Sequence, residues 1–280
     1  MCVWSACVCV VSLRFRERRT MSLCFLIPIS LPVFTLPAIW IIYAIALNNQ
    51  HICPVNNWLY NSSCKTPLVF QSTSDLCCTL DNIPLLSKCG GVPPESCWFS
   101  LLCTASSFMV IVIGLLRYAQ VIHKQNNSVL NVEGLCAGWL CAAGLLIVGN
   151  FQVDHAKVFH YVGAGLSFPG SLLFVCVQTL LSYRTAETHR DLHVAHLRLT
   201  LTTLALTSIV LSGVFFVQES FVLQHGSAVL EWLFALIILL FYGSFSHEFS
   251  FISTETLVSV LRRQTSSEKD QTLEKSQPKV

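Results

Sequence analysis

The chain has 280 residues, of which 53% are hydrophobic and only 11% are charged. The apolar fraction is above the globular norm and the charged fraction is less than half of it, which excludes an ordinary soluble protein. The formal net charge is +2, so the chain as a whole is neither strongly basic nor strongly acidic, and the positions of the charges are more informative than their sum.

Long apolar windows recur along the chain and predict membrane spans. Each has roughly 18 to 24 residues with almost no charge, enough to cross a hydrocarbon core of ~30 Å at ~1.5 Å per residue. Glu231 falls inside the last window, one turn from its start, where an interfacial depth would let it reach water. The sequence therefore predicts an all-α fold, a polytopic six-helix transmembrane bundle. The six windows are Cys24–Leu47, Trp98–Leu116, Gly134–Phe151, Phe159–Ser182, Leu199–Val217 and Val229–Phe245.

The basic residues between the windows predict the orientation. With the N-terminus inside, 14 of the 17 Lys and Arg residues fall in cytoplasmic segments, and only Lys65, Lys88 and Lys157 fall outside. This asymmetry predicts that both termini are cytoplasmic. A basic inner face suits anionic inner-leaflet lipids as partners; the alternative is that it serves only as the topology signal that every membrane protein needs.

The chain divides into three predicted parts: an N-terminal extension (1–20), a six-span membrane domain (21–249) and a cytoplasmic tail (250–280). In the extension the apolar run precedes the charges and is too short to span a membrane, so it does not fit a secretory signal. We interpret it as dispensable, with Cys2, Cys7 and Cys9 as candidates for palmitoylation.

The segment 48–96 is predicted to be a cysteine-rich outer loop within the membrane domain. Cysteines on the outer side of a membrane become oxidised, so the set predicts up to three disulfides, and the sequence does not choose among their pairings. A zinc site is the alternative on a cytosolic interpretation, but no CxxC pair supports it. Asn61 begins the sequon NSS and is the predicted glycosylation site. The disulfide candidates are Cys53, Cys64, Cys77, Cys78, Cys89 and Cys97.

A polar hinge joins the third and fourth windows within the stretch GNFQVDHAKVFHYVGAGLSFPG. About seven residues connect the windows, so the two helices are expected to be antiparallel neighbours. The hinge residues Asn150, Asp154, His155 and His160 have the side chains of a metal or proton site. However, Asp154 and His155 are adjacent, and such residues point apart on a helix, which favours hydrogen bonds that cap the hinge.

Small residues recur at every fourth position on both sides of this hinge. Such stripes let helix backbones approach closely in lipid. The alternative is a substrate-binding kink at Pro169. We interpret the small residues as packing surfaces: Gly134, Gly138 and Ala142 on the third helix, and Gly163, Ser167 and Ser171 on the fourth.

The tail begins with an amphipathic stretch that could lie on the inner leaflet. Beyond Gln264 it is polar, charged and without aromatic residues, a composition typical of disorder. It is expected either to order on a cytosolic partner or to act only as a solubilising tether. The short match RRQT makes Thr265 a candidate phosphorylation site, whose phosphate would weaken attraction to the leaflet.

Motifs for catalysis are absent from the sequence. It contains no Walker loop, GxSxG, HExxH or nucleotide fingerprint. No Asp, Glu, Lys or Arg lies in the middle of a window, where a proton relay or an ion-coupled transporter would need one. We therefore expect a protein that is not an enzyme, has no cofactor and binds no nucleic acid.

Six stretches resemble the transmembrane-protein-150 branch of the damage-regulated autophagy modulator (DRAM-like) superfamily. The likeness runs from about Met21 to Leu261, and the loop from Cys77 to Cys97 is most similar to the A type of this branch. The stretches are PPESCWFS, LLRY, VGNFQVDHAKVFHYVGAGLSFPGSLLFV, LSGVFFVQES, LQHGSAVLEW and FYGSFSHEF.

This resemblance implies a six-span protein of the plasma membrane without enzymatic activity. Its implied partners are the phosphatidylinositol 4-kinase III alpha complex and the membrane adaptor of that complex, so that it would regulate phosphoinositide levels. Other members of the superfamily imply two alternatives: an autophagy modulator of endosomes and lysosomes, or a component or modulator of a mechanosensitive channel.

Overall fold

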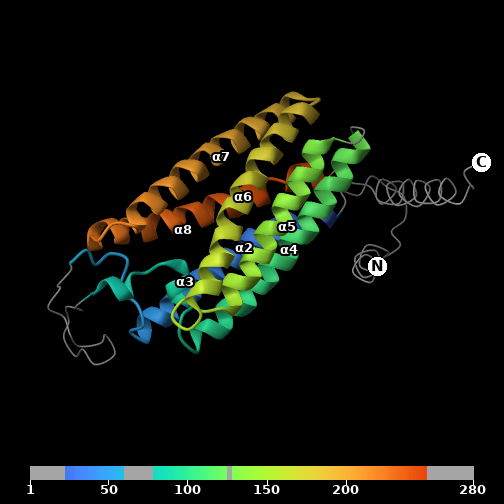
Figure 1. Cartoon of the computed structure of the whole chain (residues 1–280). Coiled ribbons are helices and arrows are strands. Elements are labelled where there is room, and N and C mark those ends of the chain that lie inside the picture. Colours follow the sequence, from blue (N-terminus) through green and yellow to red (C-terminus); the bar gives the residue numbers. More distant parts are fainter. Residues whose placement is uncertain (1–22, 60–77, 125–127, 251–280) are drawn as a thin grey trace, which may run out of the picture.

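The computed structural model describes residues 23–59, 78–124 and 128–250. Within them, six long helices have the length and apolar composition to cross a membrane, which confirms the predicted all-α, six-span fold. They are α2 (Leu26–Asn48), α4 (Glu95–Lys124), α5 (Val129–Asn150), α6 (Lys157–Thr185), α7 (His189–Phe216) and α8 (Phe221–Gly243) (Figure 1). Short helices are η1 (Leu23–Phe25), η3 (Leu80–Asn82), α3 (Leu86–Cys89) and α9 (Ser246–Phe249).

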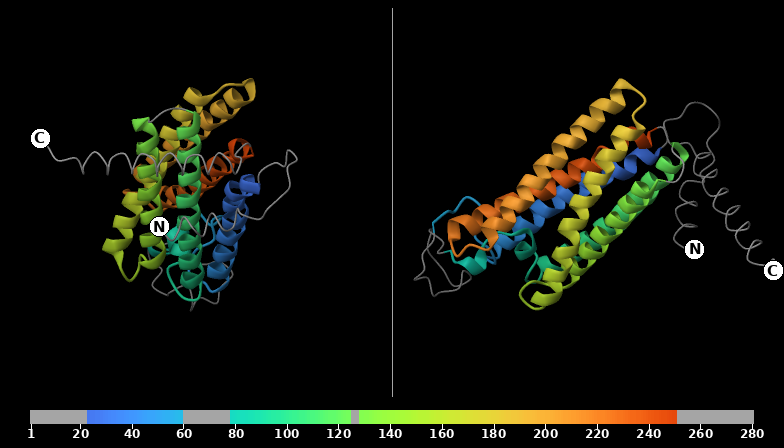
Figure 2. Two further views of the ribbon diagram at one scale, coloured as in Figure 1. Left: turned by 90° about the vertical axis from the view of Figure 1, so that its right-hand side faces the viewer. Right: turned by 45° about the horizontal axis from the view of Figure 1, so that its top comes forward.

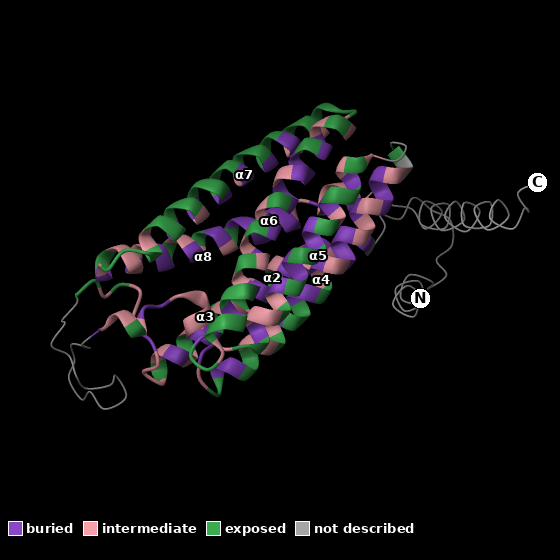
Figure 3. Ribbon diagram, viewed as in Figure 1, coloured by how far each residue is buried: buried purple, intermediate pink, exposed green. Residues whose placement is uncertain are grey.

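The six long helices close into a ring. Each of them packs mainly against its neighbours in the chain, and α8 also packs against α2 (Figure 2). Aromatic side chains fill the centre: Phe174 of α6 and Phe241 and Tyr242 of α8 are almost completely buried. Exposed leucines and valines cover the outward face of α7 (Figure 3), as expected of a helix that faces lipid.

The ring has two ends, which we call the terminal end and the loop end. At the terminal end η1 packs against α9, α4 ends, α5 begins, and the connection from α6 to α7 lies there (Figure 1). At the loop end lie the described parts of the segment between α2 and α4, and the connections from α5 to α6 and from α7 to α8. In the predicted orientation, the terminal end is cytoplasmic.

The fifth helix begins earlier than the hydropathy windows predict. It starts at His189 rather than Leu199, because a capping box fixes its first turn. The Thr188 hydroxyl accepts a hydrogen bond from the Asp191 backbone N–H at 3.2 Å, and the Asp191 carboxylate accepts one from the Thr188 N–H at 3.0 Å. A helix can thus continue through charged residues that a hydropathy window excludes, and this places Arg198 inside α7.

Candidate functional site

A cluster of charged side chains is buried among the helices near the terminal end. Arg117 comes from α4, Arg198 from α7 and Glu248 from α9. The side chains of Arg117 and Arg198 are 2% and 0% exposed, and that of Glu248 is 15% exposed. Charges at such depth are costly unless they are paired and hydrogen-bonded, so the contacts of each group determine what the cluster can do.

Every nitrogen of the Arg198 guanidinium has a hydrogen-bond partner. Its two terminal nitrogens bind the two Glu248 oxygens in a bidentate ion pair, with Nη2 and Oε2 at 2.7 Å. Nη1 also donates to the Ser182 hydroxyl at 2.6 Å, and Nε donates to the Ser244 hydroxyl at 2.9 Å. The guanidinium carbon lies 4.4 Å from the centre of the Phe245 ring, a cation–π contact.

Arg117 reaches the same carboxylate less directly. Its Nη1 lies 3.5 Å from Glu248 Oε1 and donates to Gln120 Oε1 at 2.9 Å. Its Nε donates to Gln178 Oε1 on α6 at 3.2 Å, while Nη2 has no hydrogen-bond partner within the described residues. The Phe245 ring also faces Arg117, at 5.6 Å. Two guanidinium groups therefore share one carboxylate and one aromatic ring.

The structure corrects the expectation that charged side chains stay outside the spans. Arg117 and Arg198 border the second and fifth windows in the sequence, yet both are buried within helices. Glu231, which was expected to reach water, is 9% exposed and lies beside Leu86 and Cys89 of the outer loop. The hydropathy windows end at charged residues, whereas the helices continue through them.

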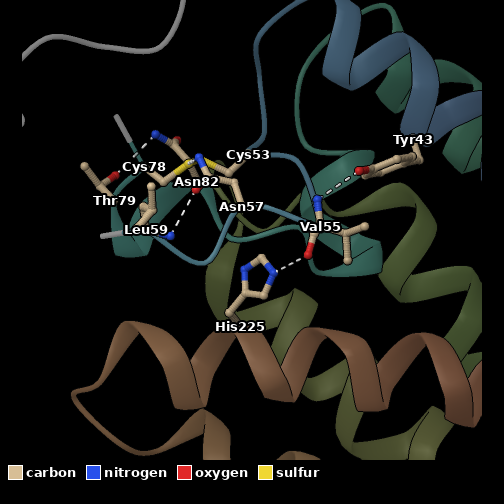
Figure 4. The surroundings of a disulfide bond; sticks show 9 residues. All are labelled: Tyr43, Cys53, Val55, Asn57, Leu59, Cys78, Thr79, Asn82 and His225. Atoms are coloured by element: carbon tan, nitrogen blue, oxygen red, sulfur yellow. Dashed lines mark hydrogen bonds between the residues drawn. A yellow bond between two sulfur atoms is a disulfide. The ribbon is translucent and has the colours of Figure 1, made fainter. Parts of the chain in front are cut away.

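The outer loop has two described parts, residues 49–59 and 78–94, which we call its limbs. Both limbs dock on the loop end of the ring (Figure 4). His225 of α8 hydrogen-bonds through Nε2 to the Val55 carbonyl at 2.7 Å, and Trp232 donates from Nε1 to the Pro84 carbonyl at 2.9 Å. The Val55 N–H donates to the Tyr43 hydroxyl of α2 at 3.0 Å. The loop is therefore held to both α2 and α8.

The cysteines of this loop form fewer described bonds than predicted. Cys53 and Cys78 form a disulfide that joins the two limbs, whereas Cys89 and Cys97 are free thiols. Cys89 packs with Ile42, Ala46 and Ile52 in the interior, where burial raises the pKa of its thiol, while Cys97 is exposed on the first turn of α4. The two thus lie in different environments. Cys64, Cys77 and Asn61 lie outside the described residues, as does Thr265.

We predict that Cys53→Ser will loosen the outer loop. The disulfide closes a segment with a sequence separation of 25 residues, and a native disulfide of this kind typically contributes about 2–4 kcal/mol. Surface delivery should fall, and proteolysis between the limbs should accelerate. Cys97→Ser is the matched control and should behave like the wild type, because Cys97 is an exposed thiol. Equal surface loss in both variants would contradict the role of the disulfide.

The hinge residues form hydrogen bonds with separate partners. The structure places the connection at residues 151–156, where His160 is buried and its Nδ1 bonds the Phe151 carbonyl at 2.7 Å. The Asp154 carboxylate accepts a hydrogen bond from Lys88 of α3, and His155 is exposed. Asn150 accepts a hydrogen bond from Ser100 of α4 at 2.9 Å.

These side chains therefore do not converge on one point, and the described part of the chain contains no group of three His, Cys, Asp or Glu residues that could hold a metal. Their hydrogen bonds tie the hinge to itself, to α4 and to the outer loop.

Helices α5 and α6 meet at small residues. A Cβ added to Gly134 would lie 2.8 Å from the Gln178 side chain, one added to Gly138 would lie 3.2 Å from Phe174, and one added to Gly163 would lie 2.8 Å from Ile147. Ala142, Ser167 and Ser171 are buried. The closest approach involves a residue outside the two stripes: a Cβ at Gly144 would lie 2.4 Å from the Ser167 backbone nitrogen and 2.6 Å from the Gly163 carbonyl oxygen.

The fold and its buried clusters define a multi-pass helical membrane protein. A family model described as "Frag1/DRAM/Sfk1/Cwh43P N-terminal domain" matches residues 23–252, and the chain belongs to this family. It is 53% identical to Transmembrane protein 150A of Xenopus laevis over 236 residues, which cover 84% of this chain and 87% of that protein.

More relatives extend the comparison. Transmembrane protein 150A of Homo sapiens is 52% identical over 86% of this chain and 89% of its own length. A Xenopus laevis protein named Modulator of macroautophagy TMEM150B-A is 31% identical over 80% of this chain and 85% of its own length. No solved structure matches the chain.

Proposed function

We propose that this protein is a non-enzymatic scaffold of the plasma membrane that helps recruit or retain the phosphatidylinositol 4-kinase III alpha complex through the membrane adaptor of that complex. By holding the kinase near its lipid substrate it regulates phosphoinositide levels. The similarity to the two Transmembrane protein 150A sequences, above 50% identity, carries the proposal, because the resemblance to the A type is what implies this partner.

The distribution of charge supports the proposed orientation. Within the described ranges, five Lys and Arg residues belong to the terminal half of the ring and two to the loop end, as the positive-inside rule requires for a cytoplasmic terminal end. The Cys53–Cys78 disulfide at the loop end supports an oxidising environment there. The basic residues in the terminal half of the ring are Arg117, Lys124, Arg184, Arg190 and Arg198, and those at the loop end are Lys88 and Lys157.

The terminal end offers two features that a cytosolic complex could use. Lys124, Arg184 and Arg190 are exposed around the ends of α4, α6 and α7, at the level where anionic inner-leaflet headgroups would lie. The chain also leaves the ring at this end, after α9, to continue as residues 251–280. A basic rim beside a polar tail suits a protein that works by holding a partner at the leaflet.

Deletion of residues 251–280 tests the proposal. If the tail contributes a contact of about 1.4 kcal/mol, recruitment of the kinase complex to the plasma membrane should fall about tenfold. Microscopy of the tagged kinase and an inner-leaflet phosphoinositide reporter provide the measurements. A tail of the same length and composition in scrambled order is the control. If both the deletion and the control reach the cell surface and recruit the kinase as the wild type does, the proposed role of the tail is wrong.

An autophagy modulator is the second candidate, favoured by the relative whose name carries that role. It predicts that the protein leaves the cell surface for endosomes and lysosomes when cells are starved. Surface labelling before and after starvation distinguishes the two functions, because a scaffold for a plasma-membrane kinase would stay at the surface.

A further inference from the structure

The charged cluster lies where the chain leaves the ring. Glu248 belongs to α9, the last helix described, and stands two positions before residue 250. It is also the most exposed member of the cluster, since its side chain is 15% exposed and the two arginines are almost completely buried. Glu248 is thus the member of the cluster nearest to residue 250, the last residue described, and the one most accessible to solvent.

Glu248 is held through both its side chain and its backbone. The carboxylate binds Arg198 of α7 and lies near Arg117 of α4. Its carbonyl accepts a hydrogen bond from Gln120 Nε2 of α4 at 3.0 Å. The next residue, Phe249, is fully buried and stacks on Phe245 with ring centres 6.1 Å apart. Helices α4 and α7, which are not neighbours in the ring, therefore both hold α9.

We propose that Glu248 is a latch that couples the packing of α4 and α7 to the docking of α9 on the ring. While the two helices keep their present distance, both arginines hold the carboxylate and α9 stays docked. When α4 and α7 move relative to each other, the carboxylate cannot keep both contacts, and α9 is released. Coupling between distant parts requires an element with two discrete arrangements, and in this proposal these are α9 docked and α9 released.

After release the arginines keep neutral hydrogen-bond partners but lose their carboxylate, so the released state is higher in free energy than the docked one. Arg198 keeps its hydrogen bond to Ser182 on α6, and Arg117 keeps those to Gln178 and Gln120. Release therefore removes both ion pairs of Glu248 and the packing of α9, while the hydrogen bonds between the arginines and their neutral partners remain. This inference concerns the conformation of the chain and does not depend on which partner binds the tail.

Hydrogen–deuterium exchange of the full chain in lipid nanodiscs tests the latch. Glu248→Gln keeps the shape of the side chain but removes its charge, and charge-assisted hydrogen bonds are about twice as strong as neutral ones. Exchange in residues 244–250 should rise about tenfold, while peptides of α5 and of the loop end stay within about twofold of the wild type. Glu133→Gln is the matched control, because Glu133 is an exposed glutamate near the same end.

A second variant separates charge from geometry. Arg198→Lys keeps the charge but loses the two-pronged fork that binds both carboxylate oxygens, so exchange in 244–250 should lie between those of the wild type and Glu248→Gln. Unchanged exchange in 244–250 in Glu248→Gln would overturn the latch. Exchange that rises equally in every helix would overturn it as well, since the cluster would then stabilise the fold as a whole.

Discussion

Gly144→Leu is expected to separate α5 from α6 and to prevent correct folding. A Cβ at this position would lie 2.4 Å from the Ser167 backbone nitrogen and 2.6 Å from the Gly163 carbonyl oxygen. Because both atoms belong to the backbone, no side-chain rotation relieves the clash and the helices must move apart. Overpacking typically costs about 1–3 kcal/mol and occasionally more, and we expect a loss of at least about 3 kcal/mol here. Thermal unfolding in nanodiscs and retention in the endoplasmic reticulum measure it.

Other glycines of α6 and α5 provide a graded control series. Gly165→Leu should behave like the wild type, because no atom lies within 4 Å of a Cβ at Gly165. Gly138→Leu should be milder than Gly144→Leu, since its nearest neighbour is the Phe174 ring at 3.2 Å, and a side chain can shift. If Gly165→Leu is as damaging as Gly144→Leu, general crowding of α6 explains the loss and the close contact does not.

The sequence predicts the helices better than it predicts their contacts. Runs of apolar residues long enough to cross a membrane identify all six helices, because a helix forms all the hydrogen bonds of its backbone internally and needs none from lipid. The small residues at Gly134, Gly138 and Gly163 also point to the surface between α5 and α6. Gly144 does not continue the four-residue spacing from Gly134. A helix has 3.6 residues per turn, so a contact line between crossed helices drifts away from any fixed spacing.

The charged cluster could not be predicted from local pattern. Arg198 and Glu248 are 50 positions apart, and Arg117 comes from a third helix. In the sequence, each arginine looks like an ordinary basic residue at the edge of a window. Only the closure of the helix ring, with α8 packed beside α2, brings Glu248 close to both arginines. The capping motif at Thr188 and Asp191 was the one signal that could have placed Arg198 inside α7.

Phe174→Ala is expected to destabilise the six-helix ring more than any substitution on the outer surface of the helices. Phe174 is fully buried in the centre, stacks on Tyr242 with ring centres 5.1 Å apart and lies 6.1 Å from the Phe245 ring. Removing a buried phenylalanine typically costs about 3–5 kcal/mol, because the cavity collapses only partly. The midpoint of thermal unfolding in nanodiscs should fall accordingly. Phe34→Ala is the control, since Phe34 is 72% exposed on α2.

The same variant separates a packed core from a hydrophobic gate. A gate closes a pore by excluding water from an apolar constriction. If Phe174 formed such a gate, truncating its aromatic side chain should produce steady ion conductance in a protein that still folds. A packed core should instead lose stability and conduct nothing, because Phe174, Tyr242 and Phe245 fill space that no ion uses. Reconstituted Phe174→Ala in planar bilayers, measured beside Phe174→Leu, distinguishes the two. Conductance in Phe174→Ala with an unchanged unfolding midpoint would contradict the packed core and favour the mechanosensitive-channel alternative over the scaffold.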